Sequence, residues 1–323
     1  MVGACKKSGE QKGASRIILP SSTGKMGELV MIIEPNLWDG LPGAMVKEKL
    51  MTEKIGLPQI EPMFHVVHIP KKAFSNIFKT HRNLIITEKS DSSYAVFSKD
   101  VWAEDQKVLF VHYKNEKELT LLLRAHGAQW ASAFEQEEFK RLQKSYRKAP
   151  LSELAPFLSA KEITLQLPKD FRINIQQENF IWLFRDKREN TQGILIYETA
   201  LYDDQDIFER ILEVRDSVTE MYVEGELPNT HMQVEMQYAP SMTSTAVSDM
   251  FAVDTRGLWR MKNDFMGGPF VSISVLDEKR KRVVTVDAFV YAPGKDKRNL
   301  MWELEAVLES LKLTPQKQLN AAL

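Results

Sequence analysis

The sequence has almost no cysteine, no long apolar run and no excess of charge. Cys5 is the only cysteine among 323 residues, so the chain can form no internal disulfide, no cysteine-based zinc cluster and no CxxC redox pair. No apolar run reaches the roughly 18 residues that a membrane-spanning helix needs. Lys and Arg total 43 against 44 Asp and Glu, and this balance argues against nucleic acid as a partner.

Signatures of common enzymes and metal sites are also missing. The sequence contains no GxSxG elbow, no HExxH helix and no EF-hand loop. Pro20–Lys25 resembles a phosphate-binding loop only in part, because Leu19 replaces its first glycine and Met26 its final hydroxyl. His65 and His68 fall in a predicted strand, where residues three apart point to opposite faces. We therefore expect no cofactor and no metal.

The residues around Cys5 are typical of lipid attachment. Val2, Gly3 and Ala4 precede the cysteine, and a polar, glycine-containing tract, 6–16, follows it. This arrangement resembles the end of a bacterial lipoprotein signal, in which the thiol takes a diacylglyceryl group. The charged and apolar regions of such a signal do not precede Cys5. The alternative is a cytosolic N-terminus with an incidental free thiol.

A lipid on Cys5 would make the membrane a partner of this chain. Each buried methylene contributes about 0.8 kcal/mol, so two or three acyl chains hold a protein firmly. Lys6 and Lys7 stand where surface-export signals carry an acidic run. The sequence therefore predicts a lipid-anchored protein of the bacterial cell envelope, on the periplasmic side rather than the cell surface.

Hydrophobic periodicity predicts an α+β chain of two similar lobes, each a mainly antiparallel sheet packed with helices. Pro150 and Pro156 mark the break between them. The predicted organisation is a tether (1–16), an N-terminal lobe (17–150), a C-terminal lobe (151–314) and a tail (315–323). The expected strands are 28–33, 63–69, 83–87, 94–102, 107–113, 163–167, 171–175, 180–185, 193–198, 232–237, 271–275 and 284–290.

Amphipathic patterns predict helices at 41–53, 116–147, 203–222 and 296–311. Asn115 and Glu118 form a capping box for the second helix, and His126 lies on its apolar stripe, where a buried histidine is expected. Asp203 and Asp204 are expected to cap the third.

Several segments together resemble the DUF4837 family, uncharacterised lipoproteins of Bacteroidota. They are Leu19–Gly24, Leu37–Gly40, Gly56–Pro62, Arg256–Trp259, Gly268–Phe270, Val290–Pro293 and Lys297–Arg298. Their order extends the resemblance over nearly the whole chain after the tether. The resemblance implies an envelope lipoprotein and supplies no catalytic residues. The element order of the second half is also similar to a PsbP-like α/β/α sandwich, an analogy of fold rather than function.

The candidate ligand-binding residues are Arg256, Trp259, Lys297 and Arg298. The segment 256–270 is rich in glycine, aromatic and charged residues without a clear period, which is typical of a shaped surface loop. Guanidinium and indole groups there would hold an anionic ligand or a sugar. The alternative is structural, with the tryptophan in the core and the cations at a helix start.

These features predict a non-enzymatic binding or assembly component of the envelope, with an envelope protein or a glycan as its partner. The alternative is an envelope hydrolase that uses a carboxylate pair. For that alternative, Asp254, Asp264 or Asp287 would have to gather near Arg256.

Overall fold

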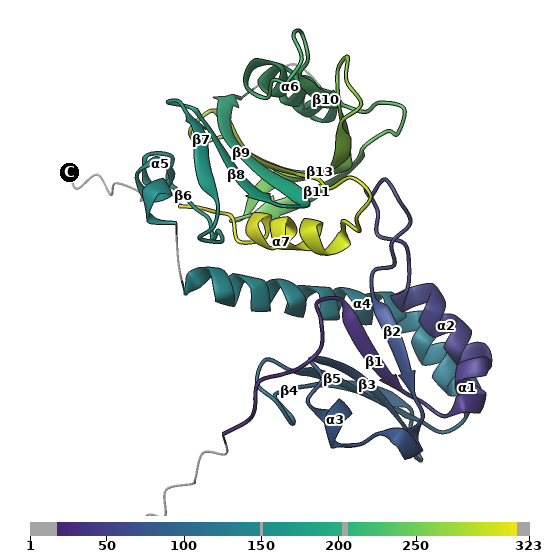
Figure 1. Cartoon of the computed structure of the whole chain (residues 1–323). Helices are drawn as coiled ribbons and strands as arrows, with labels where there is room; N and C mark the ends of the chain where they lie inside the picture. Colours follow the sequence, from purple (N-terminus) through teal and green to yellow (C-terminus); the bar gives the residue numbers. More distant parts are fainter. Residues whose placement is uncertain (1–17, 149–150, 202–205, 315–323) are drawn as a thin grey trace, which may run out of the picture.

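A computed structural model describes residues 18–148, 151–201 and 206–314, and it shows two lobes joined by one long helix (Figure 1). The predicted α+β class is confirmed. Cys5, the tether and the predicted tail lie outside the described residues, and the lobe boundaries stay predictions.

The N-terminal lobe is built on a five-stranded sheet in the order β2-β1-β3-β5-β4. Its strands are β1 (Glu28–Ile32), β2 (His65–Ile69), β3 (Asn83–Lys89), β4 (Tyr94–Lys99) and β5 (Lys107–Tyr113). The pairs β1/β2, β1/β3 and β3/β5 are parallel, and only β4 runs antiparallel to its neighbour. This differs from the mainly antiparallel sheet predicted for this lobe.

Crossover connections explain the difference. Parallel neighbours need a connection of about a dozen residues or more, usually helical. Between β1 and β2 run α1 (Pro35–Asp39) and α2 (Leu41–Leu50), and between β2 and β3 run η1 (Lys71–Ala73) and α3 (Asn76–Lys79). These two connections place β2 and β3 on either side of β1. Sequence patterns locate strands but do not say which way a connection crosses the sheet.

The long helix α4 (Glu116–Arg147) begins as the capping box predicted. The Asn115 side chain accepts a hydrogen bond from the Glu118 backbone N–H at 3.0 Å. The prediction of a buried His126 is wrong, because its side chain is exposed. Gly127 takes the buried position instead, and a Cβ there would come within 2.7 Å of the Lys49 side chain. The helix therefore turns its bare backbone, not an imidazole, toward α2.

The C-terminal lobe is built on an eight-stranded sheet whose described pairs are all antiparallel, as predicted for it. The order is β10-β12-β13-β14-β9-β8-β7, with β11 also beside β12. These strands are β7 (Arg172–Gln176), β8 (Phe180–Lys187), β9 (Asn190–Ala200), β10 (Met232–Val234), β11 (Ser241–Val247), β12 (Met250–Met261), β13 (Gly267–Asp277) and β14 (Arg282–Tyr291). The short elements are η2 (Ser152–Leu154), α5 (Ala155–Ala160), β6 (Ile163–Thr164) and β15 (Lys312–Leu313).

Helices cover both faces of this sheet, α6 (Ile207–Tyr222) on one and α7 (Arg298–Leu308) on the other (Figure 1). This layering matches the α/β/α sandwich that the element order suggested. Asp206 caps α6 and accepts from the Phe208 N–H at 2.9 Å; the predicted caps Asp203 and Asp204 lie outside the described residues. Because α6 covers the second face of the sheet, Ser272 and Asp287 are buried.

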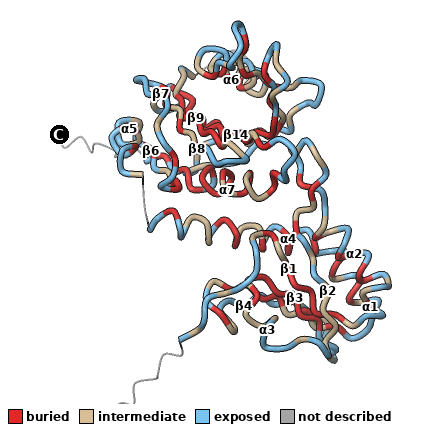
Figure 2. The backbone as a smooth tube through the Cα atoms, in the orientation of Figure 1, coloured by how far each residue is buried: buried red, intermediate tan, exposed pale blue. Residues whose placement is uncertain are grey.

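The two lobes share one hydrophobic core. Buried side chains run continuously from the N-terminal sheet through α4 to α7 (Figure 2). At the crossing, the Trp302 ring of α7 lies 5.4 Å from that of Phe64 and 6.1 Å from that of Phe139, centroid to centroid. Trp302 is therefore a core residue that joins the lobes.

Candidate functional site

The connection between α2 and β2 forms an arm, residues 53–62, that reaches from the N-terminal lobe to the C-terminal lobe (Figure 1). Its ends are held together: Glu53 and Pro62 form a bridge, and the Lys54 N–H donates to the Glu61 carbonyl at 2.9 Å. Gly56 has a φ of +84° and lies against Arg256 of β12, which is a conformation that glycine adopts without strain. The arm therefore brings one of the DUF4837-like segments onto another.

Glu61 of the arm caps helix α7 from the opposite lobe. Its carboxylate accepts from the backbone N–H of Lys297 at 2.7 Å and of Arg298 at 2.9 Å. The first N–H groups of a helix lack partners within the helix and carry the positive end of its dipole, so a carboxylate is stabilised there. Glu61 is only 6% exposed. The anion site at this helix start is filled by the protein itself.

Lys297 and Arg298, two of the predicted ligand-binding residues, bind the arm. The Lys297 ammonium donates to Gln59 Oε1 at 2.9 Å, and Arg298 Nη1 donates to the Pro62 carbonyl at 2.8 Å. Burial lowers the pKa of both side chains, while Glu61 acts in the opposite direction. Both cations are therefore engaged in contacts between the two lobes.

Behind the arm lies a buried charge network with contributions from both lobes. The Lys54 ammonium is 2.8 Å from Glu305 of α7 and 2.8 Å from Glu135 of α4. Arg256 is 2.8 Å from Glu305 and 2.9 Å from Asp254. Burial alone would raise the pKa of Glu305, but Lys54 and Arg256 outweigh it and the pKa is lowered. Burial is likewise outweighed at the two cations, chiefly by Glu305, and their pKa values are raised.

Arg256 and Trp259 do not form one surface. The surface loop predicted at 256–270 is wrong: β12 continues to Met261 and β13 begins at Gly267. Three residues apart on a strand, the two side chains point to opposite faces. Arg256 faces α7, whereas Trp259 is 2% exposed, donates its indole N–H to the Val290 carbonyl at 3.2 Å and contacts Phe289.

The three acids considered for a hydrolase do not converge. Asp254 pairs with Arg256 on the α7 face. Asp287 is fully buried on the α6 face, 2.7 Å from Arg215 of α6. Asp264 lies in the turn between β12 and β13. The sheet separates the first two, so the named set offers no paired carboxylates.

The Arg215–Asp287 pair has incomplete hydrogen bonding. Burial raises the pKa of Asp287, and the Arg215 guanidinium opposes this without outweighing it. Within the described part of the chain, Arg215 Nη1 and the hydroxyls of Thr255 and Ser272 are buried without a hydrogen-bond partner. Thr255, Ser272 and Asp287 stand opposite one another on β12, β13 and β14. This row beneath α6 has polar atoms that ordered water would satisfy.

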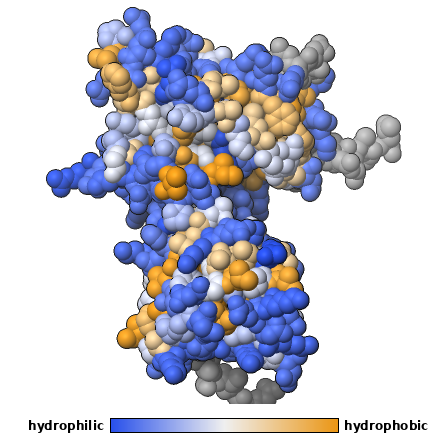
Figure 3. Space-filling view, turned by 90° about the vertical axis from the view of Figure 1, so that its right-hand side faces the viewer, coloured by the Kyte–Doolittle hydropathy of each residue, from blue (hydrophilic) through white to orange (hydrophobic). Residues whose placement is uncertain are grey.

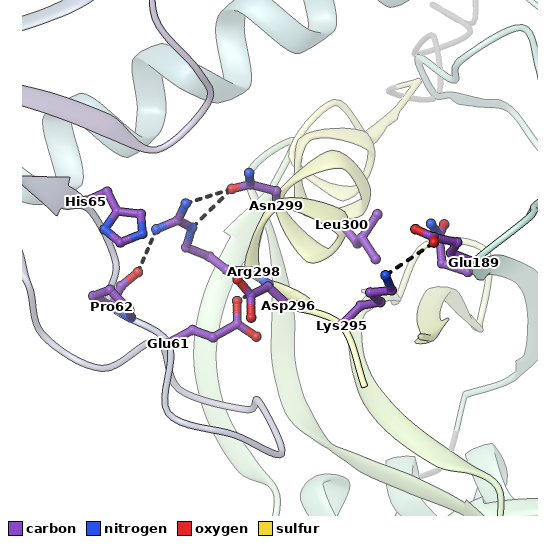
Figure 4. A pocket seen from close by; sticks show the side chains of 10 residues that line it. Glu61, Pro62, His65, Glu189, Lys295, Asp296, Arg298, Asn299 and Leu300 are labelled. Atoms are coloured by element: carbon purple, nitrogen blue, oxygen red, sulfur yellow. Dashed lines mark hydrogen bonds and ion pairs between the residues drawn. The ribbon is translucent and has the colours of Figure 1, made fainter. Parts of the chain in front are cut away.

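A pocket of about 250 Å³ opens at the junction of the lobes beside the arm (Figure 4). Its walls carry both charges and come from both lobes: Glu61, Pro62, His65, Glu189, Asn190, Lys295, Asp296, Arg298, Asn299 and Leu300. Arg298 lies between Pro62 and Asn299, and Lys295 pairs with Glu189 at 3.2 Å farther along (Figure 4). Asn190 Oδ1 is buried and has no hydrogen-bond partner among the described residues.

Exposed apolar side chains lie near the pocket, on the arm. Ile55 and Ile60 of the arm are 68% and 80% exposed, and strongly hydrophobic atoms appear at the waist between the lobes on this side (Figure 3). At the other end of β14, away from the pocket, the basic run Lys279–Arg282 is partly paired, because Arg280 and Arg282 both contact Asp277. The waist is the part of this face where pocket and exposed apolar side chains meet.

His68 and Trp38 of the N-terminal lobe contact each other. His68 stacks on Trp38 with ring centroids 4.7 Å apart, and its Nε2 lies 3.0 Å from the Ile33 carbonyl. No group of three or more His, Cys, Asp or Glu residues suited to a metal ion occurs within 18–148, 151–201 and 206–314. Over the same ranges, no helix is long and apolar enough to span a membrane.

The sequence analysis did not identify three residues at the junction of the lobes: Glu61, which lines the pocket, and Lys54 and Glu305 of the charge network behind the arm. Glu305 carried a usable signal, because a charge four residues after Met301 falls on the buried stripe of α7. Lys54 carried none and Glu61 only its place in the segment Gly56–Pro62, since both lie in a connection without hydrophobic periodicity. Only the fold brings the arm, α7 and β12 together.

Comparisons with known proteins give families without an assigned function. Residues 22–147 match the model of DUF8532, and residues 153–310 match that of DUF4837, each described as a domain of unknown function. The resemblance to DUF4837 was expected to span nearly the whole chain. Instead, two segments that suggested it, 37–40 and 56–62, fall within the DUF8532 match.

Solved structures show only remote similarity. LpqN of Mycobacterium tuberculosis, involved in cell envelope biogenesis, is 15% identical with a TM-score of 0.31, over 47% of this chain and 83% of LpqN. The Ran-binding protein Mog1p of Saccharomyces cerevisiae is 9% identical with a TM-score of 0.34, over 47% of this chain and 90% of Mog1p. Similarity at this level supports no functional assignment.

No curated protein matches the chain. The family predicted from the sequence motifs is confirmed for the C-terminal lobe, whose residues 153–310 match DUF4837.

Proposed function

We propose that this chain is a lipid-anchored protein of the bacterial cell envelope that binds a small polar ligand in the junction pocket without catalysing a reaction on it. The observation that carries the proposal is the pocket itself, whose lining is contributed by both lobes. Ligand sites occur preferentially between such structural units. The periplasmic face of the membrane is the proposed location.

The groups in the pocket support binding more than catalysis. Glu61 is committed to the start of α7 and Arg298 to Asn299 and the arm, so neither is free to act as an acid, a base or a nucleophile. Lys295 and Glu189, by contrast, form a rim pair whose side chains are 51% and 61% exposed. An exposed pair contributes at most about 1 kcal/mol, and a ligand can therefore replace it.

The chemistry of the lining favours a small zwitterionic molecule, such as an amino acid, a short peptide or an amino sugar. Lys295 would pair with a ligand carboxylate, and Glu189 with a ligand ammonium. Asn190 Oδ1, which is buried and unpartnered among the described residues, would accept a hydrogen bond from a ligand donor. An amino sugar would agree with the glycan partner expected from the sequence.

Binding can be tested by NMR titration of the full chain with glycylglycine and with glucosamine. We expect shifts at the amides of Asn190, Lys295 and Asn299, and a roughly tenfold weaker affinity, equal to about 1.4 kcal/mol, after Lys295→Ala. Lys279→Ala, an exposed lysine at the far end of the lobe, is the control. Shifts confined to residues outside the pocket would contradict the proposed site.

The anchor is tested separately by expressing the gene with its upstream in-frame codons and separating membranes from soluble protein. Wild-type chain should sediment with membranes and Cys5→Ala should not. A Cys5→Ala chain that stays with the membrane would remove lipidation from the proposal and leave the pocket untouched.

A further inference from the structure

The N-terminal lobe has an end that differs from the rest of its surface, around η1 and α3. The segment 70–82 contains Lys71, Lys72, Lys79 and Arg82 and no acidic residue. No ion pair involves Lys71, Lys72 or Lys79 within the residues that the structure describes, whereas Arg82 pairs with buried Glu138 at 2.6 Å. Three ammonium groups are therefore available at this end.

The same segment also has an exposed apolar side chain. Ile77 of α3 is 80% exposed, which leaves a large aliphatic group in water. Phe74 is turned the other way and packs edge-on against Trp102, with ring centroids 6.1 Å apart. The segment is thus fixed to the sheet by one hydrophobic residue and exposes another, in a stretch of chain that also carries Lys71, Lys72 and Lys79. Apolar and basic side chains on one surface are typical of segments that lie in a membrane interface.

The described chain begins beside this segment. The Thr23 N–H donates to the Thr80 carbonyl at 2.8 Å, and the Arg82 N–H donates to the Thr23 carbonyl at 2.9 Å. Ile18, where the described residues start, is 89% exposed. The described chain therefore starts close to the residues that follow α3 (Figure 1).

Acidic residues near this end are mostly engaged. Asp105 pairs with Lys144 at 2.7 Å, Glu28 lies 3.5 Å from His81, and Asp100 accepts from the Gln106 N–H at 3.2 Å. Glu104, beside Pro20, has no ion pair among the described residues. Asp100 also lacks an ion pair among the described residues, and Glu28 is balanced only when His81 is protonated, which burial disfavours by lowering the pKa of His81. The excess of positive charge belongs to the segment 70–82 itself.

We infer that the surface formed by Lys71, Lys72, Ile77 and Lys79, the α3 surface, rests on an anionic lipid headgroup layer. This inference depends on the proposed lipid anchor, because the anchor holds the α3 surface within reach of the bilayer. Each lysine near an anionic surface favours contact by roughly fivefold. Contact here would point the C-terminal lobe and the arm away from the membrane.

The test couples the full chain through Cys5, its only thiol, to a maleimide lipid in vesicles. Vesicles are made of phosphatidylcholine alone or with phosphatidylglycerol. Lysines are then modified with an amine-reactive reagent and quantified by mass spectrometry. On the anionic vesicles we expect at least fivefold slower modification of Lys71, Lys72 and Lys79, and unchanged modification of the exposed C-terminal-lobe lysines Lys262, Lys279 and Lys281.

Two variants make the result specific. Ile77→Asp should abolish the protection, whereas Phe265→Asp, at a fully exposed aromatic on the other lobe, should not. Equal modification on both kinds of vesicle would overturn the inference, and so would protection that survives Ile77→Asp. Because the tether is chemical, either result is independent of whether Cys5 is acylated in the cell, which the fractionation of Cys5→Ala decides.

Discussion

Two arginines, the buried Arg215 and the partly buried Arg256, lie on opposite faces of the same sheet, and the acids beside them differ in the direction of their pKa shifts. Glu305, on the α7 face, lies between Arg256 and Lys54, and its pKa is lowered. Asp287, on the α6 face, has Arg215 as its cation, and its pKa is raised. Burial disfavours the charge on both acids. The number of cations that reach each acid decides the outcome.

The second cation on the α7 face comes from the other lobe. Lys54 belongs to the arm, so the charge of Glu305 is balanced only when the lobes are joined. The α6 face is covered by its own lobe alone, and there Arg215 Nη1 stays unpartnered within the described chain. The comparison indicates that charges and hydrogen bonds are more completely paired at the junction of the lobes than beneath α6.

Replacement of Glu305 should have the largest effect on stability. Glu305→Gln removes the anion between Lys54 and Arg256 and leaves the buried ammonium and the partly buried guanidinium undercompensated, so we expect a loss of about 3–5 kcal/mol in the free energy of unfolding. Denaturant titration followed by circular dichroism measures it. Glu309→Gln, at the end of the same helix, is the control and should change stability by less than about 1 kcal/mol. Equal losses in the two variants would show that the ion pairs of Glu305 contribute no more to stability than the side chain of Glu309.

Removal of both charges should be tolerated better at the Arg215–Asp287 pair than at the Arg256–Asp254 pair. Arg215→Met leaves Asp287 buried without a cation, and we expect a loss of about 3 kcal/mol at neutral pH. The double variant Arg215→Met/Asp287→Leu removes both charges and should recover most of that loss. The matched pair Arg256→Met/Asp254→Leu should not recover, because Glu305 and Lys54 remain charged. Recovery of stability in both double variants would contradict the proposed difference between the α6 and α7 faces.

The cap on α7 should matter more than the cap on α6. Glu61→Ala frees two buried backbone N–H groups, and we expect a loss of about 1–2 kcal/mol, against about 1 kcal/mol for Asp206→Ala. Thermal unfolding of the two variants compares them. A larger loss for Asp206→Ala would mean that the arm contributes little to the junction.

The two acids should also give opposite responses to pH. The lowered pKa of Glu305 stabilises the fold above the ordinary pKa of glutamate, and this contribution is lost as pH falls through the folded-state value. The raised pKa of Asp287 has the reverse sign, with stability lost as pH rises from the ordinary aspartate value through the folded-state value. Each pKa unit is equivalent to about 1.4 kcal/mol.

Unfolding free energies measured across acidic pH test these signs. Asp287→Asn should make the loss of stability on acidification steeper than in the wild type, and Glu305→Gln should make it shallower. A steeper loss in both variants would contradict the assignment for Glu305.

The smallest effect is expected at the hydroxyls beneath α6. Ser272→Ala removes a buried hydroxyl without a partner among the described residues, and we expect a change within about 1 kcal/mol, toward higher stability. Ser274→Ala, which removes a hydroxyl bonded to Thr285 at 2.9 Å, should instead lose about 1 kcal/mol. A clear loss for Ser272→Ala would indicate that ordered water completes its hydrogen bonding.

Sequence patterns predicted the structure correctly where the residues involved are close together in the chain. The cap at Asn115 and the antiparallel β13–β14 pair follow from side chains near one another in sequence. The parallel direction of β2 and β3 could not be predicted in this way, because a parallel pair and an antiparallel pair of short apolar strands have the same sequence pattern. The candidate site was recovered only in part, since Lys297 and Arg298 lie at the junction pocket's edge while Trp259 lies across the sheet.

The sequence by itself determined the α+β class, the DUF4837 match of the second lobe and the positions of most helices and strands, because periodicity and capping act over a few residues. Only the tertiary structure decided which charges are buried together. Lys54 and Glu305 are 251 residues apart, and their pairing depends on an arm that crosses from one lobe to the other. No local pattern encodes such a contact, since its energy exists only once the shared core has placed both groups out of water.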